Sequence, residues 1–287
     1  MKNMIIDFHT HIFPPDFNAD RSLLLSEEQD FRGIYSSPHA KTVGVKELID
    51  YMDKEEIQRS VIFGFPWTKE KNYKHHNNYI IESIHRYPDR LTGFCCFSPL
   101  ASGITVECER CLQAGLAGVG ELAIYGSGLT QDFISSINDV MELCLKYDAP
   151  LLLHTNEPVG HEYPGKAPMT LRQIYRFIKT YPDNRIILAH WGGGIFFYSL
   201  MKKEVKEILA NVWIDTAASP FLYSPEIYQI AGELIGFDKI LFGSDYPLLR
   251  AKRYFKEMDV LALARGQMAQ IKGLNAAKLL GLLSANR

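Results

Sequence analysis

The sequence has few of the features that mark a membrane protein or a nucleic-acid-binding protein. Its 31 basic and 33 acidic side chains give a formal net charge of −2. It therefore lacks the positive excess with which proteins usually bind phosphate backbones. The longest apolar runs, such as those at residues 150–153 and 185–189, are far shorter than the about 20 residues that cross a bilayer. We expect neither a nucleic acid nor a membrane as partner.

Cysteine is also scarce. The chain has five cysteines, an odd number, and all of them lie between positions 95 and 144. Cys95 and Cys96 are adjacent, which disfavours a disulfide between them. Cys108 and Cys111 have no second pair with which to complete a zinc site. These features favour reduced, buried thiols in a cytoplasmic protein.

The rest of the composition is typical of a globular protein. Hydrophobic residues make up 47% and charged residues 22% of the 287 positions, close to the about 45–50% and about 25% of ordinary domains. Short apolar or β-branched runs alternate with amphipathic stretches. We predict strands at residues 4–8, 60–65, 92–97, 117–120, 150–153, 185–189, 212–215 and 239–243. We predict helices at residues 45–56, 77–87, 104–114, 131–147, 169–180, 195–209, 225–234, 251–263 and 268–283.

This alternation predicts the α/β class and a (β/α)8 TIM barrel. No linker or low-complexity segment divides the chain, so we expect one domain over residues 1–287. A doubly wound open sheet is the alternative, but no Gly-x-Gly-x-x-Gly motif follows the first strand. Segments 12–43 and 155–168 are too long for simple loops. Both leave the carboxyl ends of strands, where barrels build their sites, so we expect a lid or a wall there.

Imidazole and carboxylate side chains fall at the ends of the predicted strands. Alternate side chains of an extended strand point the same way, so His9 and His11 can reach one ion. In a barrel the carboxyl ends of the strands meet at one mouth. Burying many such groups is costly unless they bind one another or a metal. The candidate metal ligands are His9, His11, Glu121, His154, His190 and Asp245.

A site of imidazoles and carboxylates without a thiolate suits zinc, manganese or iron and leaves a position open for water. Water on such an ion has its pKa lowered to about 7 and becomes a nucleophile. Asp245 is then the predicted general base. His190 would either ligate a second ion or polarise a substrate oxygen. Asp215, at the end of the seventh strand, either orients a ligand histidine or caps a turn.

The long loop after the fifth strand is rich in polar side chains between prolines and glycines. We expect His161, Tyr163 and Lys166 to contact substrate, with Lys166 facing a carboxylate. An ordered surface loop is the alternative. Trp191 and Tyr246 flank predicted ligands, so each would either wall the pocket or pack beside it.

Five segments, in order along the chain, resemble the amidohydrolase superfamily of metal-dependent TIM-barrel hydrolases. The closest likeness is its amidohydrolase 2 branch, which includes aminocarboxymuconate-semialdehyde-type and resorcylate-type decarboxylases and dicarboxylate lactonases. The segments are IDFHTH at Ile6–His11, LHT at 153–155, LAHWGGG at 188–194, LFGSDYP at 241–247 and NAAKLLGL at 275–282.

The resemblance implies a divalent metal held by His9, His11, His154 and Asp245, with His190 beside the metal or at the substrate. Glu121 departs from binuclear members, which often carry a carboxylated lysine after strand four. A glutamate there resembles the TatD-type deoxyribonucleases, which hold two metals. The choice between one ion and two stays open.

Together, these observations predict a metal-dependent hydrolase of a small, carboxylated amide, ester or lactone, with Asp245 and His190 as catalytic residues. The expected cofactor is Zn²⁺, with Mn²⁺ or Fe²⁺ as alternatives. A non-oxidative decarboxylase of an aromatic or unsaturated acid is the first alternative function. A TatD-like two-metal phosphoesterase and a catalytically silent binding barrel are further ones. We expect a small-molecule substrate, and the oligomeric state stays open, including a homo-oligomer.

Overall fold

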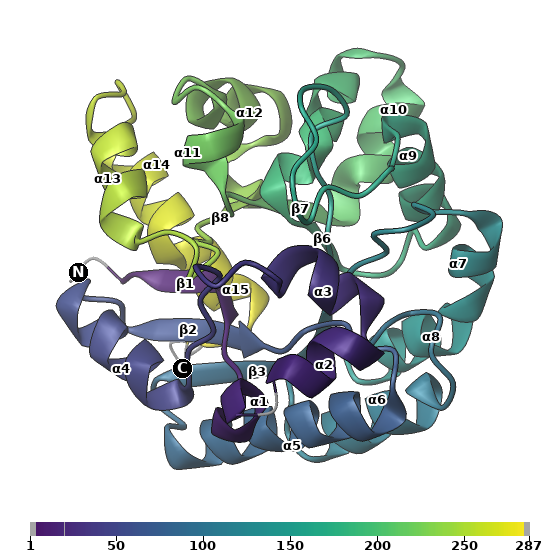
Figure 1. Ribbon diagram of the computed structural model, residues 1–287. Helices are drawn as coiled ribbons and strands as arrows, with labels where there is room; N and C mark the ends of the chain where they lie inside the picture. The colour runs from purple at the N-terminus through teal and green to yellow at the C-terminus, as the bar shows by residue number, and fades with distance from the viewer. Residues whose placement is uncertain (1–3, 20, 284–287) are drawn as a thin grey trace.

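The structure, a computed structural model, describes residues 4–19 and 21–283. Eight parallel strands form one sheet in the order β1 to β8. The sheet closes on itself because Phe8 N donates to Phe242 O (2.7 Å) and Thr10 pairs with Tyr246. The predicted TIM barrel is confirmed (Figure 1). The strands are β1 Ile6–His11, β2 Arg59–Phe63, β3 Leu91–Cys95, β4 Gly118–Leu122, β5 Leu151–Leu153, β6 Ile186–Leu188, β7 Val212–Asp215 and β8 Ile240–Leu241.

Helices cover the outside of the barrel. Apolar residues at helical spacing explain their packing: in Val45–Lys54, for example, Val45, Leu48 and Met52 are buried. The helices are α4 Val45–Lys54, α5 Glu70–Arg86, α6 Ile104–Gln113, α7 Gln131–Ser136, α8 Asn138–Lys146, α9 Leu171–Thr180, η1 His190–Leu200, α10 Lys203–Ile208, η2 Leu209–Asn211, α11 Ser219–Leu222, α12 Ile227–Ile235, η3 Phe237–Lys239, α13 Ala251–Asp259, α14 Arg265–Ala269, η4 Gln270–Leu274 and α15 Asn275–Leu279.

Several predicted boundaries are wrong. β1 extends through His11 and β4 includes Glu121, so these ligand-type residues lie inside strands and not after them. The helix predicted at 77–87 begins at Glu70. The prediction missed its first two turns because they are too polar to show an apolar stripe. The helix predicted at 131–147 is two helices that meet at Ile137.

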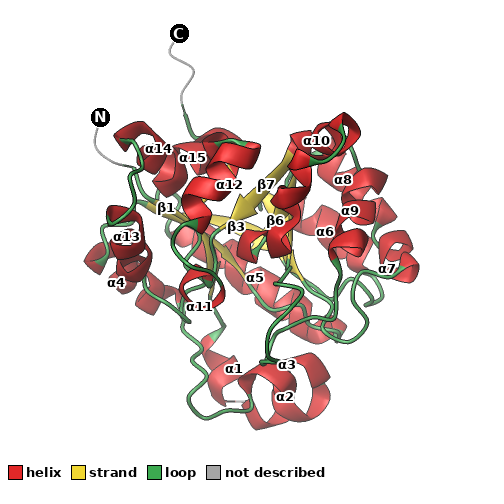
Figure 2. Ribbon diagram, turned by 90° about the horizontal axis from the view of Figure 1, so that it is seen from above, coloured by secondary structure: helices red, strands yellow, loops and turns green. Residues whose placement is uncertain are grey.

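Segment 12–43, expected to form a lid or a wall, contains helices that the sequence analysis did not predict. It contains three helices, α1 Pro15–Ala19, α2 Arg21–Glu27 and α3 Gln29–Tyr35. Figure 2 shows them gathered at one end of the barrel. Because this segment follows β1 directly, that end is the mouth of the barrel. The expectation that the segment forms a lid or a wall fits this placement.

The floor of the mouth is apolar. Phe8, Phe63, Phe94, Leu152, Ile187 and Leu241 come from six different strands and belong to one buried cluster. Strands that are not neighbours can share a cluster only inside the closed sheet. All five cysteines are buried and free, as predicted. Within residues 4–19 and 21–283, no helix combines the length and apolar character needed to span a bilayer.

Candidate metal centre

Two histidines of β1 form one side of the centre. His9 and His11 lie two residues apart in the strand, and their ring centroids are 5.3 Å apart. Both rings contact the edge of Phe63, at centroid distances of 5.0 and 4.7 Å. His9 is fully buried. The alternation of side chains along the strand therefore brings both imidazoles to one place, as predicted.

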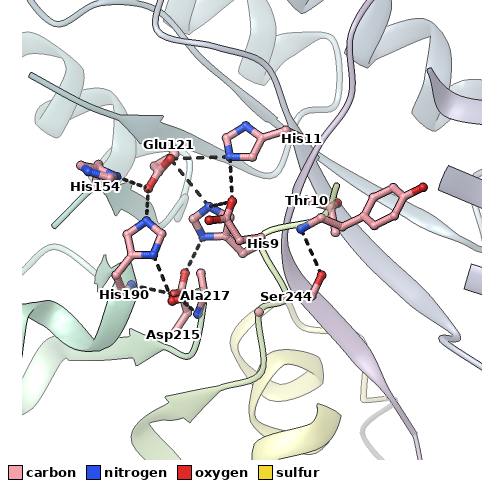
Figure 3. Close-up of polar contacts among 12 residues, drawn as sticks. His9, Thr10, His11, Glu121, His154, His190, Asp215, Ala217 and Ser244 are labelled. Atoms are coloured by element: carbon pink, nitrogen blue, oxygen red, sulfur yellow. Dashed lines mark hydrogen bonds and ion pairs between the residues drawn. The ribbon is translucent and has the colours of Figure 1, made fainter. Parts of the chain in front are cut away.

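Glu121 lies between these histidines and two others. Its Oε2 atom is 3.7 Å from Nε2 of both His9 and His11. Its Oε1 atom is 3.0 Å from His154 Nδ1 and 3.4 Å from His190 Nε2. Figure 3 shows the four imidazoles arranged around this carboxylate.

Asp245 lies on the other side of the histidine pair. Its Oδ1 atom is 3.7 Å from His9 Nε2 and 3.6 Å from His11 Nε2. With this carboxylate, the structure brings together all six residues that the sequence nominated as metal ligands. They come from β1, β4 and the segments that follow β5, β6 and β8.

The outer ring nitrogens of three histidines are held by acceptors that cannot donate a proton. Each Nδ1 must therefore carry the hydrogen, which directs Nε2 of the neutral ring toward the centre. The acceptors are Asp215 Oδ2 for His9 (2.8 Å), Gly64 O for His11 (3.1 Å) and Ala217 O for His190 (3.0 Å).

His154 is held the other way round. Its Nε2 atom donates to the carbonyl oxygen of Gly165, at 2.9 Å. Its Nδ1 atom is therefore the one that faces Glu121. As a ligand, His154 would use the ring nitrogen that His9 and His11 turn outward.

The donor atoms fit a divalent cation. His9 Nε2 is buried, and it has no hydrogen-bond partner within the described part of the chain. Two groups of three residues each place their donor atoms within 4.8 Å of one another. One group is His9, His11 and Asp245, and the other is His9, Glu121 and His190. A buried nitrogen without a partner is costly, and a cation between imidazoles and carboxylates would satisfy it.

The charges of the site also favour a cation. Burial alone lowers the pKa of His9, but the carboxylates of Asp215 and Glu121 outweigh burial and raise it to about 10. Burial would raise the pKa of Glu121, but His9 and His154 hold it well below its usual range. Burial and the neighbouring His9 lower the pKa of His11. Without a metal, the site therefore holds a proton on His9.

Asp215 has both of the functions that the sequence left open. Its Oδ2 atom accepts the hydrogen bond from His9, and its Oδ1 atom accepts from the backbone N–H groups of His190 (2.9 Å) and Ala217 (3.0 Å). It orients a histidine and also caps the turn after β7.

Asp7 is a functional candidate that the sequence interpretation missed. Its Oδ1 atom accepts from Ser244 N (2.8 Å), and Ser244 Oγ donates to its Oδ2 atom. Burial raises the pKa of this carboxyl group to about 7. Asp7 ties β1 to the residue before Asp245 and so positions that carboxylate. Asp7 shares its strand parity with His9 and His11, a signal that could have found it.

Two of these residues have unusual backbone conformations. His190 has φ 54° and Asp245 has φ 58°, in the left-handed region that residues other than glycine rarely adopt. Each follows the end of its strand, and such conformations concentrate at functional sites. Gly193 needs its left-handed conformation (φ 60°) and its lack of a side chain, because a Cβ there would lie 2.5 Å from Asn156 O.

The residues proposed to contact substrate are placed in different ways. Tyr163 donates to Glu157 Oε2 (2.7 Å). Lys166 Nζ lies 3.1 Å from Glu157 Oε1 and contacts the carbonyl oxygens of residues 159–161. Its ammonium group thus makes these contacts within its own loop and also lines one of the cavities described below. That it binds a substrate carboxylate stays a prediction. His161 is exposed on the same loop.

Trp191 does not wall the pocket. It is fully buried, donates to Ser219 Oγ (2.8 Å) and contacts Tyr228 edge-on. The packing alternative is therefore the correct one for this residue. Tyr246 is half-buried and stacks on Tyr51 with ring centroids 3.8 Å apart.

The centre opens to solvent on one side. The side chains of His11 and Asp245 are 12% and 15% exposed, whereas those of His9 and Glu121 are 0% and 4% exposed. Two cavities, of 380 and 290 Å³, lie beside the mouth, and Tyr125 lines both. Its ring centroid is 5.3 Å from that of His154.

Comparison with solved structures shows the same fold in three decarboxylases. One is 5-carboxyvanillate decarboxylase from Sphingomonas paucimobilis, with a TM-score of 0.75 and 18% sequence identity over 98% of this chain and 99% of that chain. Another is dihydroxybenzoic acid decarboxylase from Polaromonas sp. JS666, solved with bound manganese and the inhibitor 2-nitroresorcinol, with a TM-score of 0.70 and 18% identity over 98% of this chain and 97% of that chain. The third is 2,6-dihydroxybenzoate decarboxylase from Rhizobium, with a TM-score of 0.71 and 18% identity over 97% of this chain and 99% of that chain. At this identity the likeness establishes the fold. No curated protein matches the sequence.

A match to a protein-family model covers almost the whole sequence. The family model described as Amidohydrolase matches residues 6–282, nearly the whole chain. The match runs from β1, which carries the histidine pair, to the residues just after α15. It agrees with the resemblance found in the sequence. The chain therefore belongs to the amidohydrolase family.

Proposed function

We propose that this chain is a metal-dependent decarboxylase of a small aromatic or unsaturated carboxylic acid. The observation that carries the proposal is the convergence of four imidazoles and two carboxylates at the mouth of the barrel. The similar folds of three decarboxylases of aromatic acids support decarboxylation over the hydrolysis that the sequence first suggested. Hydrolysis of an ester or lactone would use the same residues and is the second candidate.

We propose that His9, His11 and Asp245 hold a single divalent ion together with His154 or Glu121. Both sets of clustered donor residues include His9, whose Nε2 atom faces both Glu121 and Asp245. That nitrogen has one lone pair and can bind only one ion. Manganese is supported by the Polaromonas structure, and zinc and iron suit the same donors. When bound, the cation would supply Lewis-acid polarisation of the substrate's carboxylate and of a neighbouring oxygen.

Asp245 would be the residue that donates a proton to the substrate. Its carboxyl group is partly exposed at the mouth and faces the histidine pair through Oδ1. In its protonated form it would give its proton to the substrate carbon that bears the carboxylate. The bond to the carboxylate then breaks, its electron pair returns to the ring or double bond, and carbon dioxide leaves. Solvent at the mouth returns a proton to Asp245.

His190 would orient the substrate. Its Nδ1–H is held by Ala217 O, and its Nε2 atom points toward Glu121 in the centre. This fixed ring would hold an oxygen of the substrate next to the reacting carbon.

The test combines metal analysis with two product assays. Elemental analysis of the purified protein should find about one transition-metal ion per chain. With Mn²⁺ in excess, 5-carboxyvanillate, 2,6-dihydroxybenzoate, esters and lactones are screened for carbon dioxide and, separately, for acid release. We expect carbon dioxide from at least one aromatic acid and a loss of about 100-fold or more in Asp245→Asn. Asp259→Asn, an exposed aspartate at the end of α13, is the matched control.

Acid release from an ester or lactone without carbon dioxide from any acid would favour hydrolysis. A protein without bound metal that also fails to take up Mn²⁺ would overturn both candidates.

A further inference from the structure

Tyr223 has a hydroxyl group that the rest of the chain leaves without a partner. The residue follows α11, in the connection after β7. Its hydroxyl oxygen is buried, and no described residue forms a hydrogen bond with it. A buried hydroxyl in this state costs free energy and calls for an explanation, such as a bound group that completes it.

The hydroxyl of Tyr223 lies close to Gly194. A Cβ atom placed on Gly194 would lie 3.9 Å from this oxygen. Gly194 belongs to the turn that begins at His190, directly after β6. Tyr223 therefore lies beside the segment that carries one of the central imidazoles.

A second group of polar side chains reaches the same place from the loop after β5. Tyr163 donates to Glu157 Oε2, and Lys166 contacts Glu157 Oε1. Burial raises the pKa of Tyr223, and the Glu157 carboxylate raises it further. Burial also raises the pKa of Tyr163, and Glu157, Tyr223 and Asp245 add to this shift. The two phenols and Glu157 therefore lie close together, and Tyr163 is within electrostatic reach of Asp245.

The charge of this group decides what it can bind. Both phenols keep their protons at neutral pH, so Tyr223 can donate a hydrogen bond. Lys166 and Glu157 neutralise one another and are already hydrogen-bonded. An anion next to Tyr223 would face the Glu157 carboxylate, and the ammonium group of Lys166 is already paired with that carboxylate. An uncharged oxygen would meet the hydroxyl donor without this repulsion.

We propose that Tyr223 is a specificity residue that donates a hydrogen bond to an uncharged oxygen substituent of the substrate, a hydroxyl, methoxy or carbonyl oxygen. This inference rests on the proposed function, because it places the acid group of the substrate at the metal-type residues. The oxygen substituent would lie on the part of the substrate that points toward the loops after β5 and β7.

The test measures binding and needs no turnover. Mn²⁺-loaded protein is titrated in a calorimeter with benzoate, 3- and 4-hydroxybenzoate, 3- and 4-methoxybenzoate, and benzene-1,3- and 1,4-dicarboxylate. We expect at least one hydroxy or methoxy compound to bind more tightly than benzoate. Tyr223→Phe should remove that gain, a loss of about five- to tenfold, and leave benzoate unchanged. The dicarboxylates should show no gain.

Tyr175→Phe is the matched control, because it removes the same group from a tyrosine whose hydroxyl contacts Glu204 on the surface. A gain that survives in Tyr223→Phe, an equal loss for benzoate, or an equal gain for the dicarboxylates would overturn the inference. So would a wild-type protein that binds none of the benzoates. In that case, metal content still reports separately whether the proposed metal centre stands.

Discussion

Single residues outside the ring of metal-type side chains hold that ring in place. Asp215 is fully buried and keeps His9 in the orientation that turns Nε2 to the centre. A carboxylate is a strong acceptor for an imidazole N–H, and such partners of ligand histidines raise metal affinity. The orientation of the ligand therefore depends on a residue that touches neither the proposed metal nor the substrate.

We expect Asp215→Ala to weaken Mn²⁺ binding by about 10–100-fold. Asp215→Asn should lose less, because its amide oxygen can still accept from His9 Nδ1. Competition with a fluorescent chelator measures both affinities. Asp183→Ala, an exposed aspartate before β6, is the control. Unchanged affinity in a folded Asp215→Ala protein would show that His9 needs no such partner.

The pKa of His9 predicts how metal binding depends on pH. In the metal-free protein this pKa is about 10, so at pH 7 the ring is protonated, and binding through Nε2 must displace the proton. Mn²⁺ affinity should therefore rise as the pH increases from 7 toward 10. Calorimetry at pH 7 in two buffers of different ionisation enthalpy should detect release of about one proton. Heats that do not depend on the buffer would contradict this.

At the scale of elements, one buried carboxylate contributes several of the hydrogen bonds between the insert α1–α3 and the start of α5. Glu28 accepts from the backbone N–H groups of Thr68 and Lys69, both at 3.0 Å, from Thr68 Oγ1 and from Asn72 Nδ2. These donors belong to the first turn of α5 and the residues just before it. Glu28 thus satisfies two backbone N–H groups just before α5, and its negative charge lies at the N-terminus of that helix.

We expect Glu28→Ala to lower the free energy of unfolding by about 3 kcal/mol, because it leaves buried donors without acceptors. Limited proteolysis should then cut within residues 12–43 before the barrel unfolds. Glu27→Ala is the control: its ion pair with Lys71 (2.7 Å) is partly exposed, and such pairs contribute less than about 1 kcal/mol. Equal stability of the two variants would remove Glu28 from this role.

The elements also show where sequence reasoning succeeds. The alternation of short apolar runs with amphipathic stretches is enough to predict eight strands that follow one another around a barrel. Each of these patterns depends only on residues that are close together in the chain. The helices α1–α3 escaped prediction because they are five to seven residues long and are stabilised by contacts such as that of Glu28. Short helices have too few turns to show an apolar stripe.

At the scale of the whole molecule, the proposed metal joins strands that are far apart in the sequence. His9 and His11 lie in β1, and Asp245 follows β8, where the barrel closes. A ligand that binds only the folded state stabilises it by about 2.7 kcal/mol at a concentration of 100 Kd.

We expect Mn²⁺ at that concentration to raise the melting temperature by about 5–10 °C over chelator-treated protein. The double variant His9→Ala/His11→Ala should fold and show no such shift. Thermal unfolding followed by circular dichroism measures both proteins. A full shift in the double variant would place the metal elsewhere.

The sequence by itself determined the barrel and the six metal-type residues, because strand periodicity and strand-end position are local properties of the chain. It predicted that His9 and His11 lie side by side even though it placed the end of β1 too early, since side-chain parity does not depend on where the strand stops. Only the tertiary structure decided that Lys166 is used within its own loop, that Trp191 packs in the core, and that Asp7, Glu28 and Tyr223 matter. Those outcomes depend on which hydrogen-bond partners lie nearby after folding. The partners of Trp191, Glu28 and Asp7 are 28, 40 and 237 residues away along the chain.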